Sequence, residues 1–192
     1  MLKLLSVSSS WSSMSVSWFS AMSSLHVRSR IKQARVMYDA SHASSENRTL
    51  HAICVPLETA AFHALLKQSL GVLMRTIHAP AALAQIARLV PWLLAAIQWI
   101  MHCAAVICLE TKRDRNAAKR ALGVHVVLTT TACLTWNVAV SLAVLAVSWA
   151  AQIGIGHTLL EKKAPSMLNE GGLTVASVTF SVLLAYLPRL HD

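Results

Sequence analysis

The chain has 192 residues and a formal net charge of +9, with 55% hydrophobic but only 13% charged residues. Because a soluble domain has about 25% charged residues, these charges are too few to cover a soluble surface. The composition excludes an ordinary cytosolic enzyme, a secreted disulfide scaffold and a disordered tail.

The N-terminal part is rich in serine. Residues 1–30 contain 12 serines, and the first acidic residue is Asp39. Such a start resembles an organelle transit peptide, and a disordered extension fits it equally well. We therefore expect an N-terminal extension over 1–30 and a single helical membrane domain over 31–192. Residues 31–41 mix apolar and polar side chains and predict a short interfacial helix.

Three stretches without any Asp, Glu, Lys or Arg cover 79 of the 192 positions: 89–109, 121–160 and 171–188. About 18–20 predominantly apolar residues span a bilayer as a helix. The pattern predicts an all-α fold, a polytopic helical membrane protein with about four transmembrane helices.

The first two spans differ in quality. Residues 49–74 form a weak span, because Glu58, His63 and Lys67 interrupt it. After a connector over 75–88 that contains Pro80, Pro91 is expected to open the cleanest span, 89–109. Residues 110–120 are predicted to be a charged connector.

The 40 uncharged residues 121–160 would make a helix about 60 Å long, twice the hydrocarbon thickness. A bend or split is therefore expected, with Trp136-Asn137 as the candidate break. Pro165 and Gly171-Gly172 separate this stretch from a last span over 173–187.

The basic residues do not form one face with interleaved aromatic side chains. They lie between the apolar stretches, mainly over 28–35, 112–120 and 162–163. This distribution is typical of connectors that contact anionic lipid headgroups, so we expect membrane lipid and no nucleic acid as a partner.

Two arrangements stand out among the nine histidines. His42 and His51 are nine residues apart, which places them on opposite faces of a continuous helix at about 100° per residue. The Ser-rich segment 44–47 offers a helix cap, and a break there would let the two rings converge, with Asn47 and His51 on one face of the new helix.

The second arrangement ends the 40-residue stretch. His157 and Glu161 are four residues apart on one helix face, and Gly154 and Gly156 allow close approach of another backbone. Ionisable groups at membrane depth are costly and often functional. Imidazoles with a carboxylate suit Fe(II) or zinc, whereas a structural role at helix ends is the plain alternative.

Further residues carry weaker signals. His102, in the middle of a span, is a possible fourth metal ligand, and a hydrogen bond to a neighbouring helix is the other interpretation. Glu58 is either a partner that orients an imidazole or half of an ion pair with Lys67 or Arg88.

The two arrangements resemble a known family of small endoplasmic-reticulum membrane proteins that includes the fungal 2-hydroxy fatty acid dioxygenase. The resemblance covers about 36–186 and rests on two patterns: Tyr38-x3-His42-x4-Asn47-x3-His51-x4-Pro56 and Gln152-x3-Gly156-His157-x3-Glu161-x3-Pro165. The chain departs from the family at Ser44-Ser45, where Asn-Pro is usual, and at Ser166, where Ala is usual.

The resemblance implies an Fe(II)-dependent dioxygenase of fatty-acid α-oxidation that uses O2 to convert a 2-hydroxy long-chain fatty acid into the acid one carbon shorter. It also implies an endoplasmic reticulum membrane location, or another organelle membrane if 1–30 is a transit peptide. By motif, His42, His51 and His157 carry over as iron ligands. Glu161 and Asn47 carry over as candidate catalytic residues with unassigned roles.

Arg48, Lys162 and Lys163 are candidates to hold the substrate carboxylate, with contact to lipid headgroups as the alternative. Two other functions compete with the dioxygenase. One is a non-enzymatic membrane scaffold or lipid-binding protein with structural histidines, and the other is a zinc-dependent lipid hydrolase.

Overall fold

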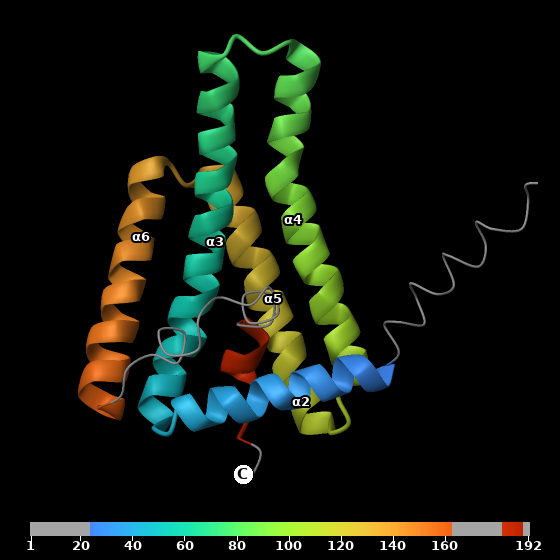
Figure 1. The fold of residues 1–192 in the computed structure, drawn as a ribbon, viewed down its shortest axis with the longest axis vertical. Helices are drawn as coiled ribbons and strands as arrows, with labels where there is room; N and C mark the ends of the chain where they lie inside the picture. Colours follow the sequence, from blue (N-terminus) through green and yellow to red (C-terminus); the bar gives the residue numbers. More distant parts are fainter. Residues whose placement is uncertain (1–23, 163–181, 190–192) are drawn as a thin grey trace, which may run out of the picture.

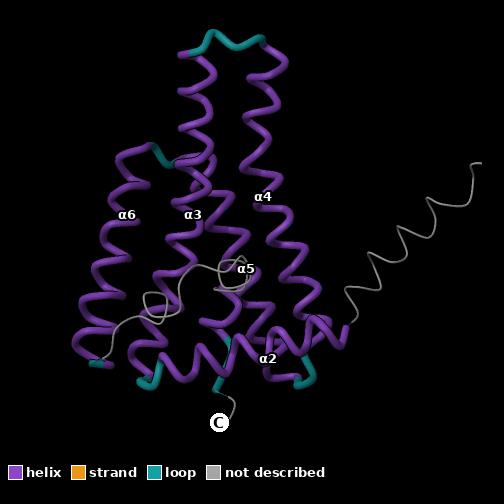
Figure 2. The backbone as a smooth tube through the Cα atoms, in the orientation of Figure 1, coloured by secondary structure: helices purple, strands orange, loops and turns teal. Residues whose placement is uncertain are grey.

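A computed structural model describes residues 24–162 and 182–189. Helix α2 (Ser24–Ser41) lies across one end of an upright bundle made of α3 (Ser45–Thr76), α4 (Ala81–Cys108), α5 (Lys112–Thr135) and α6 (Val138–Ala150), as Figure 1 shows. A π-helical segment, η1 (Ala151–Glu161), continues α6. Figure 2 shows that the described backbone consists of helices joined by short loops, which confirms the all-α prediction.

The described ranges contain three helices long and apolar enough to span a membrane: α3, α4 and the continuous segment Val138–Glu161. Helix α5 is not among them, because it begins with the charged residues of 112–120. The expected last span, 173–187, lies mostly outside the described residues, and only 182–186 are seen as helix.

The polarity of the bundle is that of a membrane protein. Where α3 meets α5, the buried residues are small: Ala60, Ala64 and Ala132 are at most 1% exposed. Large apolar side chains face outward instead, and Ile107 and Val147 are 79% and 70% exposed. Small residues let helices pack closely in lipid, and the apolar outer surface is left for the acyl chains. This arrangement supports the prediction of a helical membrane protein.

The predicted break at Trp136-Asn137 is confirmed. Helix α5 ends at Thr135, and the side chain of Asn137 caps α6 by accepting a hydrogen bond from the Val140 amide at 2.9 Å. Asparagine is favoured at this position because its carbonyl satisfies an amide that has no partner inside the helix.

Two predicted connectors are wrong in extent. Helix α4 starts at Ala81, directly after Pro80, so Pro91 lies inside the helix and does not open it. Residues 112–120 form the first turns of α5, which Thr111 caps, and only 109–111 make the turn. Charges mark where a chain leaves the hydrocarbon, whereas a helix continues as long as its backbone hydrogen bonds do. Helix α2 likewise begins at Ser24, seven residues before the expected start at residue 31.

Helix α3 extends beyond the α5–α6 turn (Figure 1) and stabilises that turn with polar side chains. The Lys67 ammonium donates to the Cys133 carbonyl at 2.5 Å, and the Gln68 amide donates to the Trp136 carbonyl at 2.9 Å. The last carbonyls of a helix have no partner within it, and lipid offers none. Lys67, which interrupts the apolar pattern of α3, therefore satisfies the end of α5.

Replacing Lys67 by Met should lower the free energy of unfolding by about 1–3 kcal/mol, because a buried carbonyl loses a charged donor. Denaturant unfolding of the detergent-solubilised chain measures the change. Lys112→Met, at an exposed position, is the control. An equal effect of the two substitutions would contradict the role given to Lys67.

Candidate metal centre

Three histidines from separate parts of the chain meet at the α2 end of the bundle. His42 lies in the α2–α3 turn, His51 in the second turn of α3, and His157 in η1. They are 5%, 8% and 4% exposed. The Nε2 atoms of His42 and His51 are 3.2 Å apart, and one ring nitrogen from each of the three residues lies within 4.8 Å of the others. The structure thus brings together the three predicted ligands.

The predicted helix break makes this convergence possible. Helix α2 ends at Ser41, and Ser44 caps α3 by accepting a hydrogen bond from the Asn47 amide at 3.0 Å. The turn at 42–44 redirects the chain from α2, which lies across the end of the bundle, into the upright α3 (Figure 1), so that the His42 ring meets His51.

The surroundings of His42 fix its orientation. Its Nδ1 lies 2.8 Å from the Tyr38 carbonyl, and its ring stacks on the Tyr38 ring with centroids 4.0 Å apart. When Nδ1–H donates to that carbonyl, the lone pair of Nε2 points at His51, as is usual for an imidazole that binds a metal. Burial is the main cause that lowers the pKa of His42 to about 4, so the ring is neutral near pH 7.

The donor set fits a transition metal. Imidazole nitrogens bind such ions at about 2.0–2.1 Å, which places two ligands of one ion about 3.0–3.4 Å apart. The separation of His42 and His51 lies in this range. The Nδ1 atom of His157 is buried without a hydrogen-bond partner among the described residues. Three imidazoles suit iron and zinc alike and leave coordination positions for other ligands.

Glu161 and Asn47 lie beside the histidines and connect η1 to α3. The Glu161 carboxylate accepts hydrogen bonds from the Ser44 amide at 2.7 Å and from the Asn47 side chain at 3.3 Å. The carboxylate thereby satisfies donors at the N-terminus of α3, where the helix dipole favours negative charge. Both residues are placed to hold His157 against His51.

The π-helical geometry of η1 was not predicted. Its end is marked by Lys162, whose backbone is left-handed (φ 52°) and whose amide donates to the His157 carbonyl five residues back. Wide π turns recur at functional sites, where they change the direction of side chains. His157 and Glu161 were predicted to share one face of an α-helix, and they instead lie on the wider turns of a π-helix.

Of the two glycines in η1, only Gly156 is in close contact with another helix. A Cβ atom built there would lie 2.2 Å from Asn47 Oδ1, whereas one on Gly154 would meet nothing within 4 Å. The absence of a side chain at Gly156 lets η1 lie directly on the residue that binds Glu161.

Among the described residues, the Glu58 carboxylate is hydrogen-bonded to no imidazole and forms no ion pair with Lys67 or Arg88. Its carboxylate accepts a hydrogen bond from the side chain of Gln152, at the start of η1. Of the two alternatives for Glu58, neither the contact that orients an imidazole nor the ion pair is formed, and Lys67 donates to α5 instead. The Glu58–Gln152 pair instead forms a second link between α3 and η1.

Arg48 is already engaged with other groups. Its guanidinium pairs with Asp39, donates to the Leu187 carbonyl at 2.5 Å and lies 5.2 Å from the centroid of the Tyr38 ring. Arg48 therefore ties α3 to α2 and to the C-terminal segment, which weighs against the predicted role in holding a carboxylate. Lys162 is exposed, and Lys163 lies outside the described residues.

Sequence reasoning missed this network, although its signal was present. Asp39 and Arg48 are opposite charges within the first histidine pattern, in a chain with few acidic residues. Arg35 makes a similar connection, because it pairs with Asp114 and donates to the Pro188 carbonyl.

His102 is not brought to the three histidines. It lies in α4, where Nδ1 is 2.7 Å from the Gln98 carbonyl, and its ring stacks on His125 of α5 with centroids 5.3 Å apart. His63 reaches the same group, with Nε2 2.9 Å from Gln98 Oε1. The hydrogen bond of His102 to Gln98 thus stays within its own helix and does not match the expected bond to a neighbouring helix, whereas its ring does contact α5; this position does not support the fourth-ligand prediction.

The fold and the three histidines define a class: a helical membrane protein with a buried site that could hold a metal ion. The chain belongs to the Mpo1-like family, since a family model described as 2-hydroxy-palmitic acid dioxygenase Mpo1-like matches residues 29–185. This match confirms the resemblance seen in the two histidine patterns. No curated protein and no solved structure matches the chain.

Gly156→Ala should weaken metal binding by about 10–100-fold, because the added methyl group displaces Asn47 and the Glu161 carboxylate that it holds. Titration of the purified chain with Fe(II) or Zn(II) measures the affinity. Gly154→Ala adds the same methyl group in open space and should bind as the wild type does. Equal affinities for the two variants would show that the close contact has no influence on the site.

Proposed function

We propose that the chain is an Fe(II)-dependent dioxygenase of fatty-acid α-oxidation, which converts a 2-hydroxy long-chain fatty acid into the acid one carbon shorter in the breakdown of sphingolipids. The observation that carries the proposal is the convergence of three buried histidines, His42, His51 and His157, in a member of the Mpo1-like family. The endoplasmic reticulum membrane is the proposed location.

The position of the site suits an amphiphilic substrate. The histidines lie at the end of the bundle that α2 crosses and where the charged first turns of α5 begin (Figure 1). Apolar side chains of η1 such as Ile155 and Leu159 face outward nearby. A 2-hydroxy acid would place its polar head at this level and its tail in the hydrocarbon.

Each residue of the site has a defined task in this proposal. The three imidazoles would hold iron, and iron, when bound, would supply the redox chemistry that activates O2. Tyr38 orients the His42 ring through its carbonyl and its stacked ring. Glu161 and Asn47 hold η1 on α3, so that His157 stays opposite His51. Burial keeps His42 neutral, with its lone pair available.

His157→Ala should abolish stoichiometric iron binding and the conversion of 2-hydroxypalmitate to the acid one carbon shorter. Metal analysis and a product assay with Fe(II) and O2 measure both properties on the detergent-purified chain. His102→Gln removes another fully buried imidazole, outside the three-histidine cluster, and should leave both unchanged.

The same measurements separate the alternatives. Wild-type protein without bound metal and without activity on 2-hydroxy acids would favour the non-enzymatic scaffold. Bound zinc without oxygen consumption would favour the lipid hydrolase. If the His102 variant loses iron, His102 is a metal ligand after all.

A further inference from the structure

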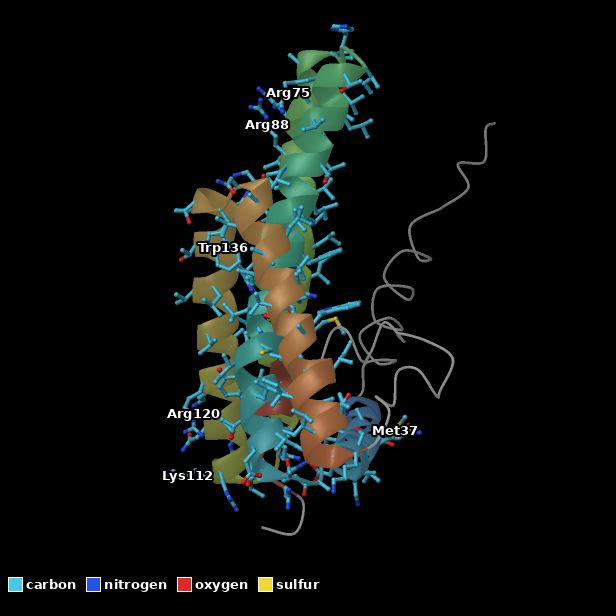
Figure 3. The ribbon with its side chains drawn as sticks, turned by 90° about the vertical axis from the view of Figure 1, so that its left-hand side faces the viewer. Met37, Arg75, Arg88, Lys112, Arg120 and Trp136 are labelled. Atoms are coloured by element: carbon cyan, nitrogen blue, oxygen red, sulfur yellow. The ribbon has the colours of Figure 1, made fainter. Side chains whose placement is uncertain are left out.

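A cavity of about 390 Å³ opens at the far end of the α3–α4 hairpin, away from the histidines. Its lining is formed by Gly71, Met74, Arg75, His78, Ala79, Ala84 and Arg88. Figure 3 shows Arg75 and Arg88 close together on one side of the hairpin, and Lys112 and Arg120 at the opposite end of the bundle.

The two arginines lack acidic partners along the hairpin. No Asp or Glu occurs in the sequence between Glu58 and Glu110. Within the described residues, neither arginine belongs to any of the ion pairs, which join Arg28 to Glu110, Arg35 to Asp114 and Arg48 to Asp39. Two neighbouring guanidinium groups repel each other, so an anion from outside the chain would stabilise the arrangement.

The depth of the cavity indicates where that anion comes from. Arg88 directly precedes the 21 uncharged residues 89–109, and Glu110 follows them. As a helix, 21 residues rise by about 31 Å, which equals the thickness of the hydrocarbon core. When the histidine end lies at one headgroup layer, Arg88 therefore lies at the other.

The shape of the cavity also suits a ligand. Gly71 contributes no side chain, and a Cβ atom built there would meet only the Arg75 guanidinium, at 3.8 Å. The nearby N-terminus of α4 has no side-chain cap, since Pro80 precedes it. The lining thus combines open space with two guanidinium groups, which favour a negative charge.

We propose that this cavity binds the phosphate group of an anionic membrane lipid, with Arg75 and Arg88 as its donors. Guanidinium groups bind phosphate oxygens through paired, charge-assisted hydrogen bonds. A lipid would present its phosphate at this depth while its acyl chains lie along the apolar face of α4 that follows Arg88, where Leu89 and Leu93 are 63% and 61% exposed. The site is independent of the proposed dioxygenase reaction.

The test measures lipid binding to the full chain in neutral detergent micelles. Native mass spectrometry follows a titration with dioleoyl phosphatidylglycerol, with dioleoyl phosphatidylcholine for comparison. The double variant Arg75→Gln with Arg88→Gln should bind phosphatidylglycerol at least roughly tenfold more weakly than the wild type does. Gly71→Leu should also weaken binding, because it fills the cavity and keeps both charges.

The matched control is Lys112→Gln with Arg120→Gln, which removes two charges from exposed positions at the other end. This control should retain wild-type affinity for phosphatidylglycerol. The proposal is overturned if the control loses as much affinity as the double arginine variant, or if Gly71→Leu binds as the wild type does. Displacement of phosphatidylglycerol by an excess of inorganic phosphate would identify free phosphate as the ligand and overturn the assignment to lipid.

Discussion

The N-terminus of α3 is the constraint on which the candidate site depends. A helix start has amide donors without internal partners, and here they are satisfied by Ser44 from the preceding turn and by Glu161 from η1. One partner is local and the other is 117 residues away. The same bonds that complete α3 therefore bring the two histidine patterns together. Gly156 allows the contact because any larger residue would collide with Asn47.

Helix α3 is also the element that pairs the polar groups of the bundle. Glu58 pairs with Gln152 of η1, Lys67 with a carbonyl at the end of α5, and His63 with Gln98 of α4. In lipid, an unpaired polar group costs several kcal/mol, and water is not present to replace the missing partner. The residues that make α3 a weak span by composition thus link it to its neighbours. These polar contacts fix how far each helix is shifted along its neighbour, because the helix contact surfaces are otherwise mostly alanine.

Arginine side chains connect the helices at the histidine end. Arg35 and Arg48 each combine an aspartate partner with a backbone carbonyl of the C-terminal segment. Helix α2 is in this way attached to α3, to α5 and to residues 187–188. The Tyr38 ring contacts both the Arg48 guanidinium and the His42 ring, so this network extends directly to a candidate metal ligand.

The sequence alone determined the class, the helix breaks at Ser44 and at Trp136-Asn137, and the three histidines that converge. Each of these follows from local physics: uncharged length, capping chemistry and the angular period of a helix. The sequence also contains the two histidine motifs that indicated the family, and the family match supports that indication.

Partners of the long polar side chains were decided only by the tertiary structure. The sequence offered Glu58 an imidazole, Lys67 or Arg88, offered Arg48 a substrate carboxylate or lipid headgroups, and offered His102 a metal or a neighbouring helix, and the choice depended on which helices became neighbours. Arg48 turned to Asp39 of α2, Glu58 to Gln152 of η1, and the His102 ring to His125 of α5. A long flexible side chain can reach many positions, so packing between helices, which no local pattern encodes, selects its partner.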